Sequence, residues 1–190
     1  MKILAFAAAM RKESYNKMLI LQACEAMRQI QDSRHKVEVD LCDFRDFDMP
    51  MYDGDWEDAN GMPVGAKRLV QKILDCQGMI ISTPEYNGGI PGTLKNAIDW
   101  ASRPQKNPFI RKPLLLLGAT PGSLAATRGL WHTRVPFEAL GCFVYSEMFG
   151  LAKADEAFDG SGKLIDPKNA QRLSQIVQGF IGFAAQLNGL

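Results

Sequence analysis

The chain has 190 residues, 46% of them hydrophobic and 23% charged, and its formal net charge is +1. These values are typical of a soluble globular protein, and they predict one domain over residues 1–190. The charges are scattered and nearly balanced, which gives no support for binding to nucleic acid or to an anionic membrane.

The first predicted element is a strand over residues 2–8, where an apolar run follows Lys2. The run superficially resembles a signal sequence, but it is short, and Arg11, Lys12 and Glu13 come directly after it. The first strand of an α/β sheet explains the run without a targeting role. Because no apolar stretch approaches the roughly 20 residues that cross a bilayer, we expect a cytoplasmic protein with no membrane partner.

The next elements follow from the spacing of apolar residues. A helix is predicted from about Ser14 to Gln31, because apolar residues recur there at helical spacing. Residues 37–41 alternate as a strand at the edge of a sheet does. Residues 45–60 are polar, aromatic and Pro-containing, and we predict a long surface loop there.

The remainder of the chain alternates between helix and strand. A helix is predicted over residues 64–76, a strand over 79–82 and then a helix capped by Thr93. After a connector over 104–113 come a strand over 114–118, a helix over 124–140 that contains Pro136, and a strand over 143–145. A turn over 159–163 precedes the last helix, which runs from Pro167 to about Leu187 and is capped by Asp166. Five strands alternating with helices predict a doubly wound parallel α/β sheet. The leucine run at 114–117 is typical of a central strand covered on both faces.

The most informative segment, residues 83–100, reads TPEYNGGIPGTLKNAIDW and follows the strand predicted at 79–82. Open α/β sheets bind ligands in loops at the carboxyl ends of their strands. Residues 84–100 meet the signature Pro-Glu-Tyr-Asn-Gly-x-x-Pro-Gly-x-Leu-Lys-Asn-Ala-x-Asp-Trp. The chain thereby resembles the flavodoxin-like NAD(P)H-dependent FMN reductases, a family that includes quinone, chromate and azo-dye reductases.

The resemblance implies a five-stranded sheet in the flavodoxin-like order 2-1-3-4-5, which the spacing of the elements alone leaves open. It also implies an FMN site built from three loops. The residues that match the family's flavin-contacting positions are Arg11, Ser14 and Asn16 for the phosphate, Pro84, Glu85, Tyr86, Asn87 and Gly88 along the isoalloxazine ring, and Thr120, Pro121 and Gly122 in a second ring-contacting loop. By elementary electrostatics, a helix N-terminus with an arginine beside it suits a phosphate group.

Some of these residues also have a purely structural interpretation. Ser14 can be a helix N-cap and nothing more. Tyr86 can be a surface aromatic residue, and Asn87 can be a turn residue. The length of the signature favours the flavin-binding interpretation of both.

The chain departs from the family at Ala8 and Ala9, where relatives have Gly-Ser. Loss of the serine hydroxyl removes one hydrogen bond to a charged group, worth about 1.5–3 kcal/mol. This corresponds to roughly ten- to hundredfold weaker binding. Backbone N–H groups and the other donors remain, so we expect weakened phosphate binding, unless position 8 needs a backbone conformation that only glycine tolerates.

The cysteines and histidines of the chain form no recognisable site. Cys24, Cys42, Cys76 and Cys142 are widely spaced, so we expect no metal centre. Cys24 and Cys76 fall within helix-like apolar patterns and are expected to be buried free thiols. His132 has no partner at motif spacing, which favours a structural role. Hydrolytic or metal chemistry therefore has no support.

The helix after the signature is expected to have a structural role. Lys95, Asn96 and Asp99 are expected to cap, to pair or to join a subunit contact, and Trp100 to lie in the core or in an interface. None of them is expected to take part in chemistry.

The resemblance implies a flavoenzyme that takes two electrons from NADPH or NADH and passes them, by a ping-pong mechanism, to quinones, flavins, azo dyes or chromate-like acceptors. It also implies a homodimer or homotetramer. Arg134 and Glu147 align roughly with charged positions in the subunit contacts of some relatives, although ordinary surface charge is the commoner explanation. Two alternatives stay open: an FMN-binding electron carrier or redox-responsive binding protein without NAD(P)H turnover, which the near-neutral charge disfavours, and a chain that has lost the cofactor, suggested only by Ala8 and Ala9.

Overall fold

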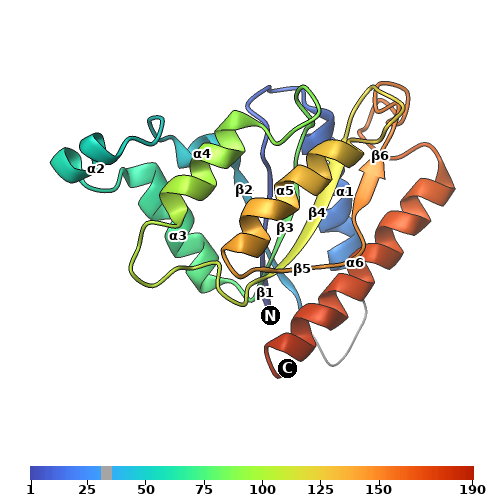
Figure 1. Cartoon of the computed structure of the whole chain (residues 1–190). Coiled ribbons are helices and arrows are strands. Elements are labelled where there is room, and N and C mark those ends of the chain that lie inside the picture. The colour runs from blue at the N-terminus through green and yellow to red at the C-terminus, as the bar shows by residue number, and fades with distance from the viewer. Residues whose placement is uncertain (31–35) are drawn as a thin grey trace.

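A parallel sheet crosses the molecule, and helices cover both of its faces (Figure 1). The computed structural model describes residues 1–30 and 36–190. The elements along the chain are β1 (Lys2–Ala7), α1 (Tyr15–Arg28), β2 (Glu38–Asp43), the 3-10 helix η1 (Phe44–Phe47), α2 (Gly54–Asn60), α3 (Val64–Asp75), β3 (Gly78–Ser82), α4 (Gly92–Ala101), β4 (Pro113–Ala119), α5 (Thr127–Ala139), β5 (Phe143–Val144), β6 (Phe149–Leu151) and α6 (Pro167–Leu187).

The strand order is β2-β1-β3-β4-β5, with β6 also paired to β4, and these pairs are all parallel. This is the flavodoxin-like order, so the predicted doubly wound sheet is confirmed, as is the edge position of the second strand. The prediction missed β6. Pro113 and Leu114 of β4 pair with β5 and residues 117–119 with β6, so two short strands share one edge of β4. Three residues are too few to show an alternating pattern.

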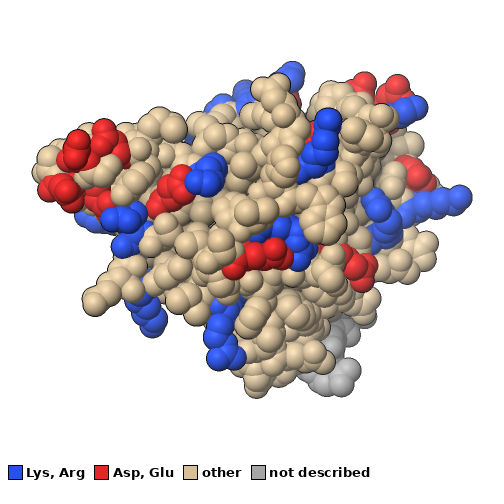
Figure 2. All heavy atoms as spheres, viewed as in Figure 1, with Lys and Arg blue, Asp and Glu red and all other residues tan. Residues whose placement is uncertain are grey.

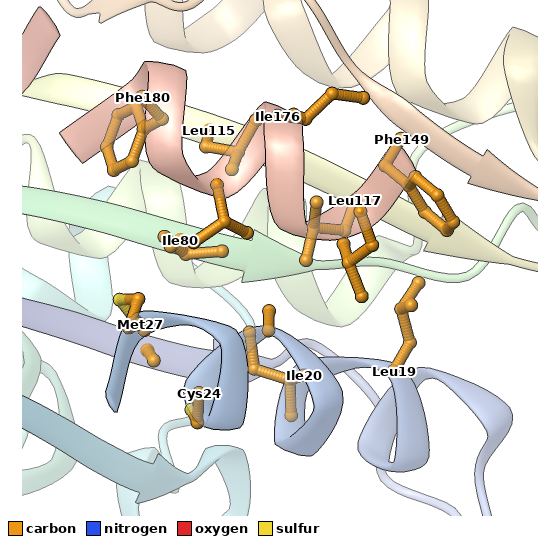
Figure 3. Packing of buried hydrophobic residues seen from close by; sticks show 14 of the residues in the cluster. Leu19, Ile20, Cys24, Met27, Ile80, Leu115, Leu117, Phe149, Ile176 and Phe180 are labelled. Atoms are coloured by element: carbon orange, nitrogen blue, oxygen red, sulfur yellow. The ribbon is translucent and has the colours of Figure 1, made fainter. Parts of the chain in front are cut away.

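Two apolar clusters, one on each face of the sheet, form the core. In the first, side chains of α1 and α6 meet Ile80, Leu115 and Leu117 of the central strands (Figure 3). In the second, α3, α4 and α5 pack on the opposite face. Every residue of β3 and β4 is buried, as the leucine run predicted. The accessible parts of the central strands are therefore their connecting loops.

Residues 45–60 are not the long surface loop that their composition predicts. They contain most of η1 and all of α2. Phe44 and Phe47 are buried against Phe6, with ring centroids 5.6 and 5.9 Å from that of Phe6. Asp53 starts α2 by accepting hydrogen bonds from the backbone of the first turn. The prediction was wrong because these anchors come from a distant strand and from a cap, and neither produces a periodic pattern.

Two predicted helix starts are wrong. Helix α4 begins one residue before Thr93, and no side-chain hydrogen bond caps it. The helix predicted from Leu124 begins three residues later, because Ala125 and Ala126 have positive φ angles of 51° and 56°. Such left-handed backbone interrupts a right-handed helix. The turn before α5 is consequently longer than the sequence suggested.

The boundaries of α6 agree with the sequence. Asp166 caps α6 through the N–H of Lys168 at 2.9 Å, and Pro167 is the first helical residue. The predicted end of the first helix near Gln31 is wrong: α1 ends at Arg28, with Gln29 at its C-cap, and Gln31 itself lies outside the described residues. The cap of α6 is formed by neighbouring residues, Asp with Pro directly after it, and this pattern is readable from the sequence.

Helix α4 anchors the segment before α2. Trp100 is fully buried, and its indole N–H donates to the carbonyl of Pro50 at 2.8 Å. The Asn96 amide donates to the same carbonyl at 2.9 Å. Lys95 and Asp99 form an ion pair of 2.7 Å one helical turn apart. Of the roles left open for these residues, core packing for Trp100 and pairing for Lys95 and Asp99 are confirmed.

Charge is mixed over the surface shown in Figure 2, where basic and acidic side chains are scattered among uncharged ones. Acidic atoms gather on α2, the helix at the far left, which carries Asp55, Glu57 and Asp58. Within the described ranges, no helix combines the length and the apolar character that crossing a membrane requires.

Candidate functional site

The loops that follow β1, β3 and β4 meet at the carboxyl edge of the sheet. These strands are parallel, so their carboxyl ends point the same way. Residues from all three loops line one cavity of about 150 Å³. The prediction that these loops come together is confirmed, and the position is the one at which doubly wound sheets bind ligands.

The loop between β1 and α1 presents a set of donors. No hydrogen bond between described residues uses the backbone N–H groups of residues 10–15. Arg11 and Ser14 line the cavity. The Ser14 hydroxyl oxygen accepts from the N–H of Asn16 at 3.2 Å, so Ser14 does cap α1, and its O–H is still able to donate. Together with the N-terminus of α1, these groups suit an anion such as phosphate.

Ala8 and Ala9 keep this loop in an ordinary backbone conformation. Neither has a positive φ, so position 8 does not need the freedom of glycine. Both residues are buried, and the N–H of Ala9 donates to the carbonyl of Ala7 at 2.8 Å. The departure from Gly-Ser therefore removes a hydroxyl donor, and position 8 has no conformation that requires glycine.

Asn16 fastens the three loops to one another. It is buried, and its Oδ1 accepts from the Ser82 hydroxyl and from the N–H of Ala119, both at 2.9 Å. Its Nδ2 donates to the carbonyl of Ala119 at 2.9 Å. Because Ser82 ends β3 and Ala119 ends β4, one amide holds the start of α1 against both strands. Asn16 lines the cavity, yet both polar atoms of its amide are engaged within the protein.

Residues 86–89 of the signature form a two-residue hairpin. The N–H of Tyr86 donates to the carbonyl of Gly89 at 3.1 Å, and the N–H of Gly89 returns a bond of 3.0 Å. Asn87 and Gly88 have φ angles of 52° and 77°, and an Asn-Gly pair is preferred where both central residues need positive φ. Asn87 is thus a turn residue, and Tyr86 at the hairpin's base is 54% exposed and lines the cavity.

The carboxylate of Glu85 binds the start of α5. Its Oε2 accepts from the N–H of Gly129 at 3.0 Å, and its Oε1 accepts from Nε and Nη2 of Arg128 at 2.9 and 2.6 Å. Burial acts to raise the pKa of the Glu85 carboxyl, but these hydrogen bonds outweigh burial and lower the pKa below its ordinary value. Glu85 is therefore a carboxylate at neutral pH.

The third loop is held by residues near the missed strand β6. The N–H of Thr120 donates to the carbonyl of Leu151 at 3.1 Å, and the carbonyl of Thr120 accepts from Ala154 at 3.0 Å. The Thr120 hydroxyl accepts from the N–H of Gly122 at 3.3 Å. Thr120 and Pro121 line the cavity, and β6 is part of what positions them.

Most residues predicted to bind a cofactor do line the cavity. They are Arg11, Ser14, Asn16, Pro84, Glu85, Tyr86, Thr120 and Pro121. Asn87, Gly88 and Gly122 belong to the same loops but are not among the lining residues. Glu13, Tyr15 and Ala119 also line the cavity, although none of them was predicted to bind the cofactor. The available signal was that Glu13 and Tyr15 flank Ser14 and that Ala119 precedes Thr120.

A larger cavity, of about 300 Å³, lies between α1 and β2. Its lining is mostly apolar and includes Ile20, Leu21 and Leu41. Its charged groups are Lys17 and Asp43, which pair with each other at 3.3 Å. It lacks the convergent donors of three loops, so chemistry rather than size selects the smaller cavity as the candidate site.

The four cysteines are free thiols of low reactivity. Burial raises the pKa of the Cys24 thiol to about 11 and that of Cys142 to about 12. Burial also raises the pKa values of Cys42 and Cys76. Protonated thiols are poor nucleophiles. Cys24 and Cys76 are free and buried, as predicted.

These features define a class of protein. A doubly wound sheet in this order, with an anion-binding helix N-terminus beside two further loops at its carboxyl edge, is the flavodoxin-like arrangement for binding a phosphorylated flavin. The donors around Arg11 suit a phosphate group, and Tyr86 and Thr120 line the same cavity from the other two loops.

The comparisons with known proteins name the family. Residues 1–156 match the model of the NADPH-dependent FMN reductase family. An NAD(P)H-dependent FMN reductase of Pseudomonas aeruginosa is 31% identical over 189 residues, covering 99% of this chain and 97% of that protein. A quinone reductase of Escherichia coli is 33% identical over 129 residues, 67% of this chain and 69% of that protein. The solved structure of a flavoenzyme NAD(P)H:(acceptor) oxidoreductase from Paracoccus denitrificans superposes with a TM-score of 0.81 at 26% identity, covering 97% of each chain.

The chain therefore belongs to the NADPH-dependent FMN reductase family, as its signature indicated. It is an oxidoreductase of the flavodoxin-like class with FMN as its cofactor.

Proposed function

We propose that this protein is an NAD(P)H-dependent reductase that passes two electrons, by a ping-pong mechanism, to small acceptors: quinones, flavins, azo dyes or chromate-like anions. The observation that carries the proposal is a single cavity lined by hydrogen-bond donors for a phosphate and by two loops that would flank a flavin ring. The FMN reductase and quinone reductase among its relatives support NAD(P)H as the donor and quinones and flavins as acceptors.

The residues of the cavity divide between two tasks. Arg11, Ser14 and the N–H groups of residues 10–15, which have no hydrogen-bond acceptor among the described residues, would hold the phosphate of FMN. The segments 84–88 and 120–122 would flank its ring. When bound, FMN supplies the two-electron transfer that no side chain of the site performs.

The protein's own contribution is to orient and to stabilise charge. The hairpin uses the N–H groups of Tyr86 and Gly89, whereas no hydrogen bond between described residues uses those of Asn87 and Gly88. Free backbone N–H groups at this loop would stabilise the negative charge of a reduced ring. Tyr86 is exposed at the cavity and would contact whichever flat molecule enters it.

We also propose that the protein is a cytoplasmic homodimer or homotetramer. Helix α5 exposes Trp131 and Val135, at 57% and 64%, one turn apart. Exposed large apolar residues that neighbour one another are typical of an interaction surface. Four free cysteines support a reducing compartment. Light scattering after size-exclusion chromatography measures the oligomeric state, and a monomer at micromolar concentration would contradict the proposal.

The test of function is a visible spectrum of the purified protein after addition of FMN and removal of the excess. We expect retained flavin that NADPH or NADH bleaches without oxygen and that a quinone then reoxidises. Steady-state rates at several acceptor concentrations should give parallel double-reciprocal lines. Retained flavin that neither nucleotide bleaches would identify an electron carrier, and no retained flavin would refute the cofactor assignment.

A further inference from the structure

Helix α5 has no capping residue of its own. Ala126, at its N-cap, has a left-handed φ of 56° and makes no side-chain cap. The missing acceptor comes from the signature loop, because Glu85 Oε2 accepts from the N–H of Gly129 at 3.0 Å. A carboxylate at a helix N-terminus is stabilised both by the N–H groups and by the helix dipole. Glu85 thus caps the helix that follows a different loop of the cavity.

Arg128 completes this connection from the side of the helix. Its Nε and Nη2 donate to Glu85 Oε1 at 2.9 and 2.6 Å, so two guanidinium N–H groups share one carboxylate oxygen. The Glu85 side chain is only 8% exposed, whereas that of Arg128 is 60% exposed. The ion pair therefore joins a shielded carboxylate at the cavity wall to a guanidinium that reaches solvent.

Close packing holds the hairpin on the same helix. A Cβ at Gly129 would come within 2.9 Å of the Cβ of Glu85, so only glycine allows this approach. A Cβ at Gly88, at the hairpin turn, would lie 3.7 Å from Nε of Arg128. A Cβ at Gly89 would lie 3.5 Å from Nδ1 of His132. The hairpin consequently rests against two side chains of α5 while Glu85 fastens its base.

We propose that Glu85, Arg128 and Gly129 form a latch that joins the two ring-binding loops into one rigid wall and balances the charge beside the flavin. This inference rests on the proposed function. It assigns Glu85 a positioning role in place of a direct side-chain contact with the ring. The pairing leaves no net charge at that wall, so loss of either partner exposes the charge of the other.

The charge balance is tested by the midpoint potential of bound FMN in three variants. Glu85→Gln leaves Arg128 unpaired, and the added positive charge should move the potential upward by favouring the reduced, more negative flavin. Arg128→Met leaves the carboxylate unpaired and should move it downward. The double variant should return close to the wild-type potential. In each single variant we expect FMN affinity to fall about three- to tenfold.

The rigidity of the latch is tested without flavin, by amide hydrogen exchange in the apo protein. Glu85→Gln should speed exchange at Gly129 and at residues 86–89. The matched control is Glu138→Gln, which breaks the 2.5 Å pair with Arg134 on the same helix and should change neither exchange at the hairpin nor the potential.

Three results would overturn the latch: unchanged exchange in Glu85→Gln, single variants whose potentials shift in the same direction, or a double variant that does not recover. A wild-type chain that binds no FMN would instead refute the proposed function. Only the hydrogen-exchange rates of the apo protein would then test the latch.

Discussion

The hairpin of the signature and the loop between β1 and α1 line the same cavity, but they are built differently. The hairpin is closed by its own backbone hydrogen bonds and fastened to α5 through Glu85. The other loop leaves the N–H groups of residues 10–15 without partners among the described residues. The hairpin, which we assign to the flavin ring, is thus held in shape by the protein alone. The N–H groups of the other loop, which we assign to the phosphate, would find their acceptor in a bound anion. Each of the following predictions alters one side or the connection between them.

Replacing Asn16, which connects the loops, should have the largest effect on the protein. Asn16→Leu leaves the Ser82 hydroxyl and both backbone groups of Ala119 without their partner. An unsatisfied buried polar group costs about 1–3 kcal/mol, so the free energy of unfolding should fall by about 3 kcal/mol or more. Urea denaturation measures it. Asn60→Leu, at an exposed position, is the control and should change it by less than about 0.5 kcal/mol. Equal stability of Asn16→Leu would show that the amide does not hold the loops.

Removing the charged donor of the open loop should change affinity selectively. Arg11→Ala deletes a charge-assisted hydrogen bond, so the Kd for FMN should rise roughly ten- to hundredfold. Riboflavin, which lacks the phosphate, should bind both proteins equally. Fluorescence titration with both flavins measures the difference, with Lys12→Ala as the neighbouring control. An equal loss for both flavins would place Arg11 at the ring and not at the phosphate.

Restoring the family's donor tests the same loop from the opposite direction. Ala9→Ser adds a hydroxyl where the backbone N–H is already engaged with Ala7. We expect FMN to bind roughly ten- to hundredfold more tightly, again with no change for riboflavin. Isothermal titration calorimetry with both ligands would show it. Unchanged FMN affinity would mean that the hydroxyl at position 9 does not reach the phosphate.

The hairpin side should show a small pH-dependent effect. The pKa of Glu85 in the folded protein lies below its ordinary value of 4.5. Its ionised form therefore contributes stability above that value, and the contribution is lost as the pH falls through the lower, folded pKa. Glu85→Gln should lower the unfolding free energy by about 0.5–1 kcal/mol at pH 7. The difference from wild type should shrink below about pH 4.5. A constant difference down to pH 3 would show that the carboxylate's charge is not what matters.

Much of this architecture was predictable from local signals. The buried strands at 79–82 and 114–118 appear as apolar runs, and Asp166 with Pro167 marks the start of α6. The signature at 84–100 located the central loop of the site. These features depend on residues close together in sequence, where spacing and capping chemistry are sufficient.

The missed features depend on distant partners. Residues 45–60 fold because Phe44 and Phe47 pack on Phe6 of β1. Strand β6 exists because β4 offers an unpaired edge beyond β5. Helix α5 starts late, after two left-handed alanines, and its cap comes from Glu85.

The sequence by itself determined the alternation of strands and helices, the apolar central strands and, through its signature, the family. Only the tertiary structure decided what the polar residues of the site do. Asn16 and Glu85 were predicted as ligands of a cofactor, yet their side chains are bonded to other loops of the protein. A sequence motif records which residue types a site needs. It does not record which of them contact the ligand and which hold the others in place, because that division follows from hydrogen bonds between segments far apart in the chain.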